Sequence, residues 1–225
     1  MLWLRVVSSN NNPATIAGLY LKATEDLEVF PRCVRTDCGT ENGLLAAAQC
    51  YFNRDHDHKS HLYGSSNHNQ RIESWWSQFR KLKSNFIMDF FKDMVSQGIY
   101  NTGNVFHKSC AFYCFAVLIQ RELDECREQW NCHYIRASKS SEAFGRPDYL
   151  HFVPPDNFIN FGLKVNGRDL RILNEHIDEY SIPEDLELQN EMISYFDYLH
   201  NFLNLPENST FDVARENFMR LLELC

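Results

Sequence analysis

The sequence has no long apolar run, no paired cysteine motif and no internal repeat. No apolar run reaches the ~18 residues that a membrane-spanning helix needs. The opening residues, Met1–Arg5, are too short and too poorly flanked for a signal peptide. The 8 cysteines form no CxxC pair and no dense framework of the kind that small secreted domains use. We therefore expect an intracellular protein with reduced thiols and no membrane partner.

Two groups of side chains have the composition of a zinc site, and for both the structural interpretation is favoured. Cys110 and Cys114 are spaced to share a helix face, but no second pair lies near them in sequence, so core packing is the preferred reading. His56, His58 and His61 fall in a polar segment without a cysteine partner. Loop histidines of this kind are more often plain surface than zinc ligands.

The composition indicates a folded protein with an uneven charge distribution. Hydrophobic residues make up 44% and aromatic residues 14% of the 225 residues, which excludes general disorder. Residues 1–150 contain 17 Lys and Arg against 16 Asp and Glu, whereas residues 151–225 contain 5 against 14. The net charge of −8 therefore comes from the second segment, and it argues only weakly against nucleic-acid binding by the first.

The first forty residues follow an α/β pattern. The apolar run Leu2–Val7 predicts a buried strand. Asn12 before Pro13 predicts an N-cap and a first-turn proline that open a helix. Residues 31–36 form a short segment bounded by Pro31 and by Asp37-Cys38-Gly39, which predicts a second strand that ends at Asp37. Strand, helix and strand in this order are typical of an α/β fold.

Helices are expected to dominate the rest of the chain. Helical spacing of apolar residues predicts helices over 41–52, from Asn67 onward with a break near 82–86, and over 106–130, while 54–66 reads as a polar loop. The pair Pro154-Pro155 ends the predicted main body, 1–155. The acidic segment 156–225 is expected to be a mostly helical extension, with helices over 184–203 and 211–224.

Two carboxylates, Asp37 and Glu73, are the candidate site. Asp37 follows a predicted strand, Glu73 lies in the first turns of a predicted helix, and 35 residues separate them. Carboxylates are the ligands that Mg²⁺ or Mn²⁺ prefers, and two-metal phosphoryl-transfer sites are built from them. The competing interpretation is that these are two ordinary surface acids among the 30 of the chain.

Several residues near Glu73 are candidates for DNA contact. Arg71, Arg80 and Lys81 follow the same predicted helix, where they would bind phosphates or simply form a solvated face. Asn69 and Gln70 precede Glu73 and would contact bases or sugars, although helix capping accounts for Asn69 equally well. Trp75 and Trp76 are adjacent and cannot both face the core. Core packing is expected for one, and the other is a candidate for stacking on a base or partner.

Five segments are distinctive in this sequence: Arg35-Thr36-Asp37-Cys38-Gly39-Thr40-Glu41-Asn42, Asn69-Gln70-Arg71-Ile72-Glu73-Ser74, Tyr63-Gly64-Ser65-Ser66, Trp75-Trp76 and Gly145-Arg146-Pro147-Asp148. Through these segments the chain resembles, over roughly residues 2–155, the integrase core domain of the retroviral-integrase and DDE-transposase superfamily. The first two stand at the family's D,D-35-E interval. The chain is most similar to the branch found in eukaryotic proteins derived from mobile elements.

The resemblance implies a ribonuclease H-like fold and metal-dependent DNA strand transfer of the kind used in integration and transposition. Asp37 and Glu73 would be catalytic metal ligands for Mg²⁺ or Mn²⁺, the partner would be DNA, a homo-oligomer is allowed, and a nuclear location is expected. The family's first catalytic aspartate belongs to an opening strand that has no counterpart before Leu2. Asp26 is the sole aspartate before Asp37, and it follows a predicted helix, so we do not expect it to substitute. The chain is thus expected to lack the first strands and to be impaired in catalysis, or to be a domesticated module that binds nucleic acid or protein without turnover.

Overall fold

The computed structural model describes residues 1–64, 70–137, 144–155, 158–180 and 183–224. The chain forms two compact units, each assembled from segments that are distant in sequence. Unit 1 comprises Met1–Trp3, Ser9–Ser74 and Arg127–Ser181, and unit 2 comprises Leu4–Ser8, Trp75–Cys126 and Ile182–Cys225.

Unit 1 opens with the predicted helix and strand. Helix α1 (Pro13–Leu27) begins as expected, because the side chain of Asn12 accepts a hydrogen bond from the backbone N–H of Ala14 at 2.9 Å. The helix ends at Glu28, whose φ of 56° lies in the left-handed region that stops helices. Strands β1 (Val29–Pro31) and β2 (Val34–Thr36) follow at once. The predicted strand before Asp37 is therefore confirmed as β2.

The strand that ends before Asp37 is one of a pair of parallel strands. A 3-10 turn (Thr40–Asn42) and helix α2 (Gly43–Phe52) connect β2 to β3 (His61–Tyr63), and β3 runs parallel to β2. The prediction of a loop over 54–66 was wrong at its end, because β3 lies there. The register pairs Thr36 with Tyr63, and the N–H of Gly64 continues it with a 2.9 Å bond to the carbonyl of Thr36.

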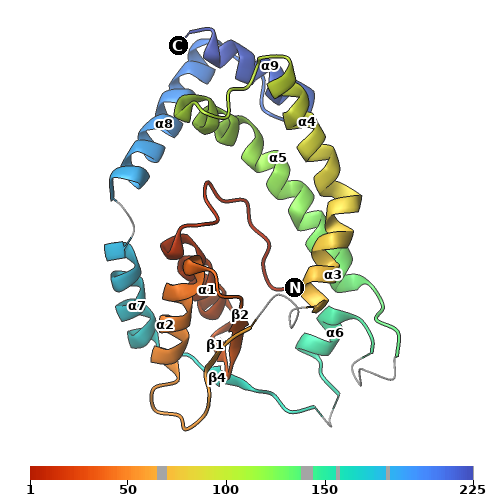
Figure 1. Ribbon diagram of the computed structural model, residues 1–225, viewed down its shortest axis with the longest axis vertical. Coiled ribbons are helices and arrows are strands. Elements are labelled where there is room, and N and C mark those ends of the chain that lie inside the picture. The colour runs from red at the N-terminus through yellow and green to blue at the C-terminus, as the bar shows by residue number, and fades with distance from the viewer. Residues whose placement is uncertain (65–69, 138–143, 156–157, 181–182, 225) are drawn as a thin grey trace. The chain divides into compact units, whose positions relative to one another are not determined.

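A second strand pair joins the acidic part of the sequence to the start of unit 1. Strand β4 (Gly162–Lys164) runs antiparallel to β1, and helix α7 (Gly167–Tyr180) follows it. Leu170, Leu173 and Ile177 of α7 share one buried core with residues of α1, α2 and β1. Figure 1 shows α7 beside α2 and α1 in this unit. These contacts connect residues 162–177 to the first fifty residues.

The prediction of a strand over Leu2–Val7 was wrong, since these residues belong to no helix or strand. Two of their backbone groups bond to a side chain instead. The side-chain oxygen of Gln120 accepts from the N–H of Val6 at 2.9 Å, and its amide donates to the carbonyl of Leu4 at 3.0 Å. A glutamine side chain here takes the place of a neighbouring strand for these two groups.

Unit 2 is helical. It contains the second half of α3 (Gln70–Phe79), a π-helical turn (Arg80–Ser84), α4 (Asn85–Ser96), most of α5 (Val105–Cys132), α8 (Pro183–Phe202) and α9 (Phe211–Leu222). Phe115, Phe196 and Phe218 are completely buried at its centre, and Cys110 and Cys114 pack among them. The two thiols are therefore core residues. The helix break expected near 82–86 is confirmed as the π-helical turn.

The described residues are mainly helical, and their strands form two two-stranded sheets. None of the described helices is long and apolar enough to cross a membrane.

Candidate metal and DNA-binding site

Asp37 directly follows β2, at the carboxyl end of the parallel pair, and its side chain is exposed. The backbone N–H of Gly39 donates to its Oδ1 at 3.3 Å, and Nδ2 of Asn42 donates to the same oxygen at 2.7 Å. Among the described residues, Oδ2 of Asp37 has no hydrogen-bond partner. One oxygen thus fixes the orientation of the carboxylate while the other stays available to a ligand.

The backbone that carries Asp37 is held by its neighbour Thr36. The Thr36 hydroxyl donates to the carbonyl of Asp37 at 2.9 Å, and it lies 3.2 Å from Nε2 of His61 on β3. Desolvation lowers the pKa of His61, which favours its neutral imidazole over the charged form. The ends of β2 and β3 are therefore tied together beside Asp37.

The core below Asp37 contains a glutamine that the sequence analysis did not single out. Gln49 of α2 is fully buried. Its Nε2 donates to the carbonyl of Pro31 at 2.7 Å and to that of Ser60 at 3.1 Å, and its Oε1 accepts from the hydroxyl of Tyr20. Pro31 precedes β2 by a short turn and Ser60 immediately precedes β3, so one side chain fixes the entry of both strands.

Glu73 lies in the first turn of α3, and its side chain is exposed. The described partners of Asp37 are Gly39 and Asn42, so no described contact joins the two acids. The first turn of a helix favours a carboxylate by itself, which also suits the surface interpretation of Glu73. Six residues lead from Gly64, which bonds to the residue before Asp37, to Gln70 at the start of α3. This length of chain spans at most about 22 Å, which limits how far the start of α3 can lie from Gly64.

The candidate DNA-binding residues fall into two groups. Arg80 and Lys81 are exposed on the π-helical turn, and neither has a carboxylate partner among the described residues. The next lysine, Lys83, differs because it forms ion pairs with Glu122 and Glu125 of α5. Unpaired cations are available to phosphates, whereas Lys83 is already neutralised.

The remaining candidates precede Glu73. Asn69 lies outside the described residues. Gln70 and Arg71 belong to α3, but their side chains also lie outside the described part of the structure. Their contact with DNA stays a prediction.

The two tryptophans of α3 divide as expected. Trp75 is 5% exposed and stacks on Phe79 with ring centroids 5.2 Å apart, whereas Trp76 is 46% exposed. One ring belongs to the core and the other is available to a partner.

The carboxylates of Asp37 and Glu73 are suited to a hard divalent cation, but two carboxylates are too few to surround it. Asp37 offers a free carboxylate oxygen, and Glu73 an exposed carboxylate. Within the described ranges, no three His, Cys, Asp or Glu side chains gather closely enough to hold a metal ion, and this includes His56, His58 and His61. Asp26 does not complete the set, because it sits on α1 and pairs with Lys22 at 2.8 Å.

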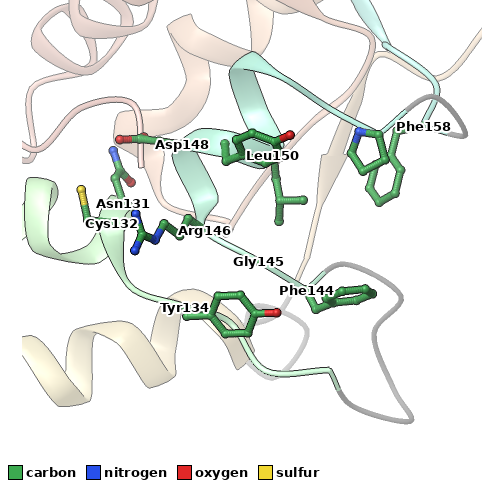
Figure 2. A pocket seen from close by; sticks show the side chains of 11 residues that line it. Asn131, Cys132, Tyr134, Phe144, Gly145, Arg146, Asp148, Leu150 and Phe158 are labelled. Atoms are coloured by element: carbon green, nitrogen blue, oxygen red, sulfur yellow. The ribbon is translucent and has the colours of Figure 1, made fainter.

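A cavity of about 770 Å³ lies elsewhere in unit 1, around the Gly145-Arg146-Pro147-Asp148 segment. It is formed by the end of α5, by the chain around Gly145, and by helix α6 (Pro147–Phe152) with the residues after it. Figure 2 shows the rings of Tyr134 and Phe144 on one side of the chain through Gly145, with Leu150 on the other. This segment is one of the motifs that carry the family resemblance, and the sequence predicted no role for it.

Comparison with known proteins gives one match. A family model described as an integrase core domain matches residues 1–144. No curated protein and no solved structure matches the chain.

Proposed function

Since the chain belongs to the integrase core domain family, we propose that it binds DNA and that Asp37 and Glu73 are metal ligands of a site for polynucleotidyl transfer. Membership in the family implies a ribonuclease H-like α/β fold. The observation that carries the proposal is the position of Asp37, which stands directly after β2 at the carboxyl edge of the parallel pair. Ligands of α/β proteins bind at this edge of a sheet.

Asp37 and Glu73 would hold Mg²⁺ or Mn²⁺ through their carboxylate oxygens. When bound, the ion supplies Lewis-acid stabilisation of charge at the phosphoryl oxygens. Asn42 and the backbone of Gly39 orient the Asp37 carboxylate through Oδ1, which leaves Oδ2 for the cation. Residues that hold a ligand in this way typically affect metal affinity about 10- to 100-fold.

DNA would be held by cations and by an exposed ring that follow Glu73. Arg80 and Lys81 present unpaired charges to phosphates, and Trp76 presents a half-exposed indole to a base. The net charge of residues 1–150 is close to zero, so binding is expected to depend on this local group rather than on the whole surface.

The metal assignment is tested by calorimetric titration of Mn²⁺ into the protein and its variants. Asp37→Asn and Glu73→Gln should each weaken Mn²⁺ binding at least about tenfold, and Asn42→Ala by about tenfold. Asp26→Asn is the matched control, since it removes an aspartate outside the site, and it should leave the affinity unchanged. Equal Mn²⁺ affinity of Asp37→Asn and the unaltered protein would overturn the assignment.

A DNA-binding module without turnover is the second candidate. The observation that favours it is that no third carboxylate joins Asp37 and Glu73 among the described residues, while Asp26 is engaged with Lys22. The two candidates separate in an assay that joins labelled DNA ends with Mn²⁺ present. Joined product that disappears in Glu73→Gln supports transfer, whereas DNA binding without product supports the module.

A further inference from the structure

The cavity of unit 1 is walled by aromatic rings that the core does not use. Tyr134 is 61%, Phe144 54% and Tyr149 60% exposed, although all three line the cavity. Exposed apolar side chains that gather in one place mark binding surfaces or ligand grooves, unlike singly exposed ones. Rings of this kind bind flat or apolar groups by stacking.

A backbone bridge holds together the two segments that carry Tyr134, Phe144 and Arg146. Ile135 and Gly145 form an isolated antiparallel bridge with hydrogen bonds of 2.8 and 2.9 Å. Tyr134 precedes one bridge residue, Phe144 and Arg146 flank the other, and all three line the cavity. Gly145 has a φ of +126°, a conformation that glycine adopts without strain, so the crossing point of the two segments depends on glycine.

The charge at the cavity is suited to an anion. Arg146 lines the cavity, and Arg136 follows the bridge residue Ile135. Both arginines are exposed, and neither has a carboxylate partner in the described part of the chain. The acid that lines the cavity, Asp148, lies in the first turn of α6, where the helix dipole partly compensates its charge. A ligand that combines flat rings with negative charge therefore matches both properties of the cavity.

We propose that this cavity binds an unpaired nucleotide of DNA, with its base stacked on the rings of Phe144 and Tyr134 and its phosphate on Arg146. The proposal rests on the proposed DNA-binding function and extends it from duplex contacts to a single-stranded end. Stacking on aromatic side chains is tolerant of sequence because every base has a flat face. The cavity would thus distinguish frayed or overhanging ends from intact duplex rather than one base from another.

The test measures fluorescence anisotropy of two labelled probes, a short oligothymidylate and a blunt duplex, over a series of salt concentrations. Phe144→Ala should bind oligothymidylate about tenfold more weakly, while Phe144→Tyr, which keeps a ring, should bind it normally. Phe152→Ala is the matched control, because Phe152 is 68% exposed on α6 but does not line the cavity. None of these changes should alter binding of the blunt duplex.

The arginine is tested by the salt dependence. Arg146→Gln should lower the slope of log affinity against log salt for oligothymidylate by about 0.7, the contribution of one phosphate contact on a single strand. Arg171→Gln, an exposed arginine of α7, is the control of equal charge and should leave the slope unchanged.

The outcomes separate the two levels of the proposal. If the unaltered protein binds neither probe, the DNA-binding function itself fails. If it binds both probes and Phe144→Ala matches Phe152→Ala, only the nucleotide cavity is overturned. Binding of a proline-rich peptide in place of oligothymidylate, with loss in Phe144→Ala, would make the cavity a peptide site and would equally overturn the proposal.

Discussion

Gln49 is the most informative single residue to change, because one buried side chain supports the strand pair that carries Asp37. We predict that Gln49→Leu lowers the free energy of unfolding of unit 1. Leucine retains the bulk of glutamine but cannot satisfy the three groups that Gln49 now bonds, namely the hydroxyl of Tyr20 and the carbonyls of Pro31 and Ser60.

The substitution affects the three hydrogen-bonded groups unequally. The carbonyl of Ser60 also accepts from the N–H of Val34 at 3.0 Å, so it keeps a partner. The Tyr20 hydroxyl belongs to a residue that is 3% exposed, and the substitution removes the acceptor of its hydrogen bond. The carbonyl of Pro31 likewise loses the amide of Gln49 as a donor. At about 1–3 kcal/mol for each orphaned buried group, and with a partial offset from the added apolar surface, we expect a net loss of about 3 kcal/mol.

The assay is urea unfolding followed by far-UV circular dichroism, with Gln129→Leu as the control, since Gln129 is an exposed glutamine of α5. A double-mutant cycle with Tyr20→Phe isolates the hydroxyl, because removing the orphaned group should recover about 1 kcal/mol of the loss. The reasoning is refuted if Gln49→Leu is as stable as the control, or if Tyr20→Phe deepens the loss rather than relieving it.

Three further predictions concern other parts of the molecule. Phe218→Ala should destabilise unit 2 by about 3–5 kcal/mol, since Phe218 is completely buried; urea unfolding measures this, and a loss below that of the exposed Phe202→Ala would contradict the packing. The pKa of His61 is lowered in the folded protein. The contribution of His61 to stability is therefore present above its ordinary pKa of about 6.5 and is lost as the pH falls through the lower pKa of the folded state. NMR titration of the imidazole ring measures this pKa, and a midpoint at or above the ordinary value would count against the prediction. Burial raises the pKa of Tyr20, so stability should be retained below about pH 10 and lost as the pH rises further. In Tyr20→Phe this alkaline loss should be smaller, and equal losses in both proteins would show that Tyr20 is not responsible.

The local features of the fold were predictable from sequence. Asn12 and Pro13 mark the start of α1 because capping depends on residues that are adjacent in the chain. The periodic apolar residues of α2 and α5 likewise predicted helices, since a helical face repeats every three or four residues. The position of Asp37 at a strand end followed from the short segment between Pro31 and the Asp37-Cys38-Gly39 turn.

The short strands were not predictable in the same way. Strand β3 has three residues and lies in a polar segment, so its existence depends on pairing with β2 and on the contact from Gln49 to Ser60. Leu2–Val7 shows the opposite error, because an apolar pattern predicted a strand where a side chain, Gln120, supplies the hydrogen bonds. Both depend on contacts between distant residues, which a local pattern does not contain.

The two candidate metal ligands could be proposed from the sequence, but the residues that orient them could not. Asp37 and Glu73 were found from their motifs and interval, and both are exposed. Asn42 was part of the quoted motif, but its role in orienting Asp37 depends on the geometry of the turn between them. The Gly145 segment was visible as a motif, yet the cavity around it requires residues from α5 and α6 to come together.

The interrupted course of unit 1 has a consequence for synthesis of the protein on the ribosome. The face of α1 that packs on Leu170, Leu173 and Ile177 is translated long before those partners, and the middle segment of unit 2 is made in between. Because domains form as their chain emerges, unit 1 must wait with an apolar surface uncovered while Trp75–Cys126 is produced. The nascent chain is therefore expected to depend on chaperone protection until α7 has left the exit tunnel.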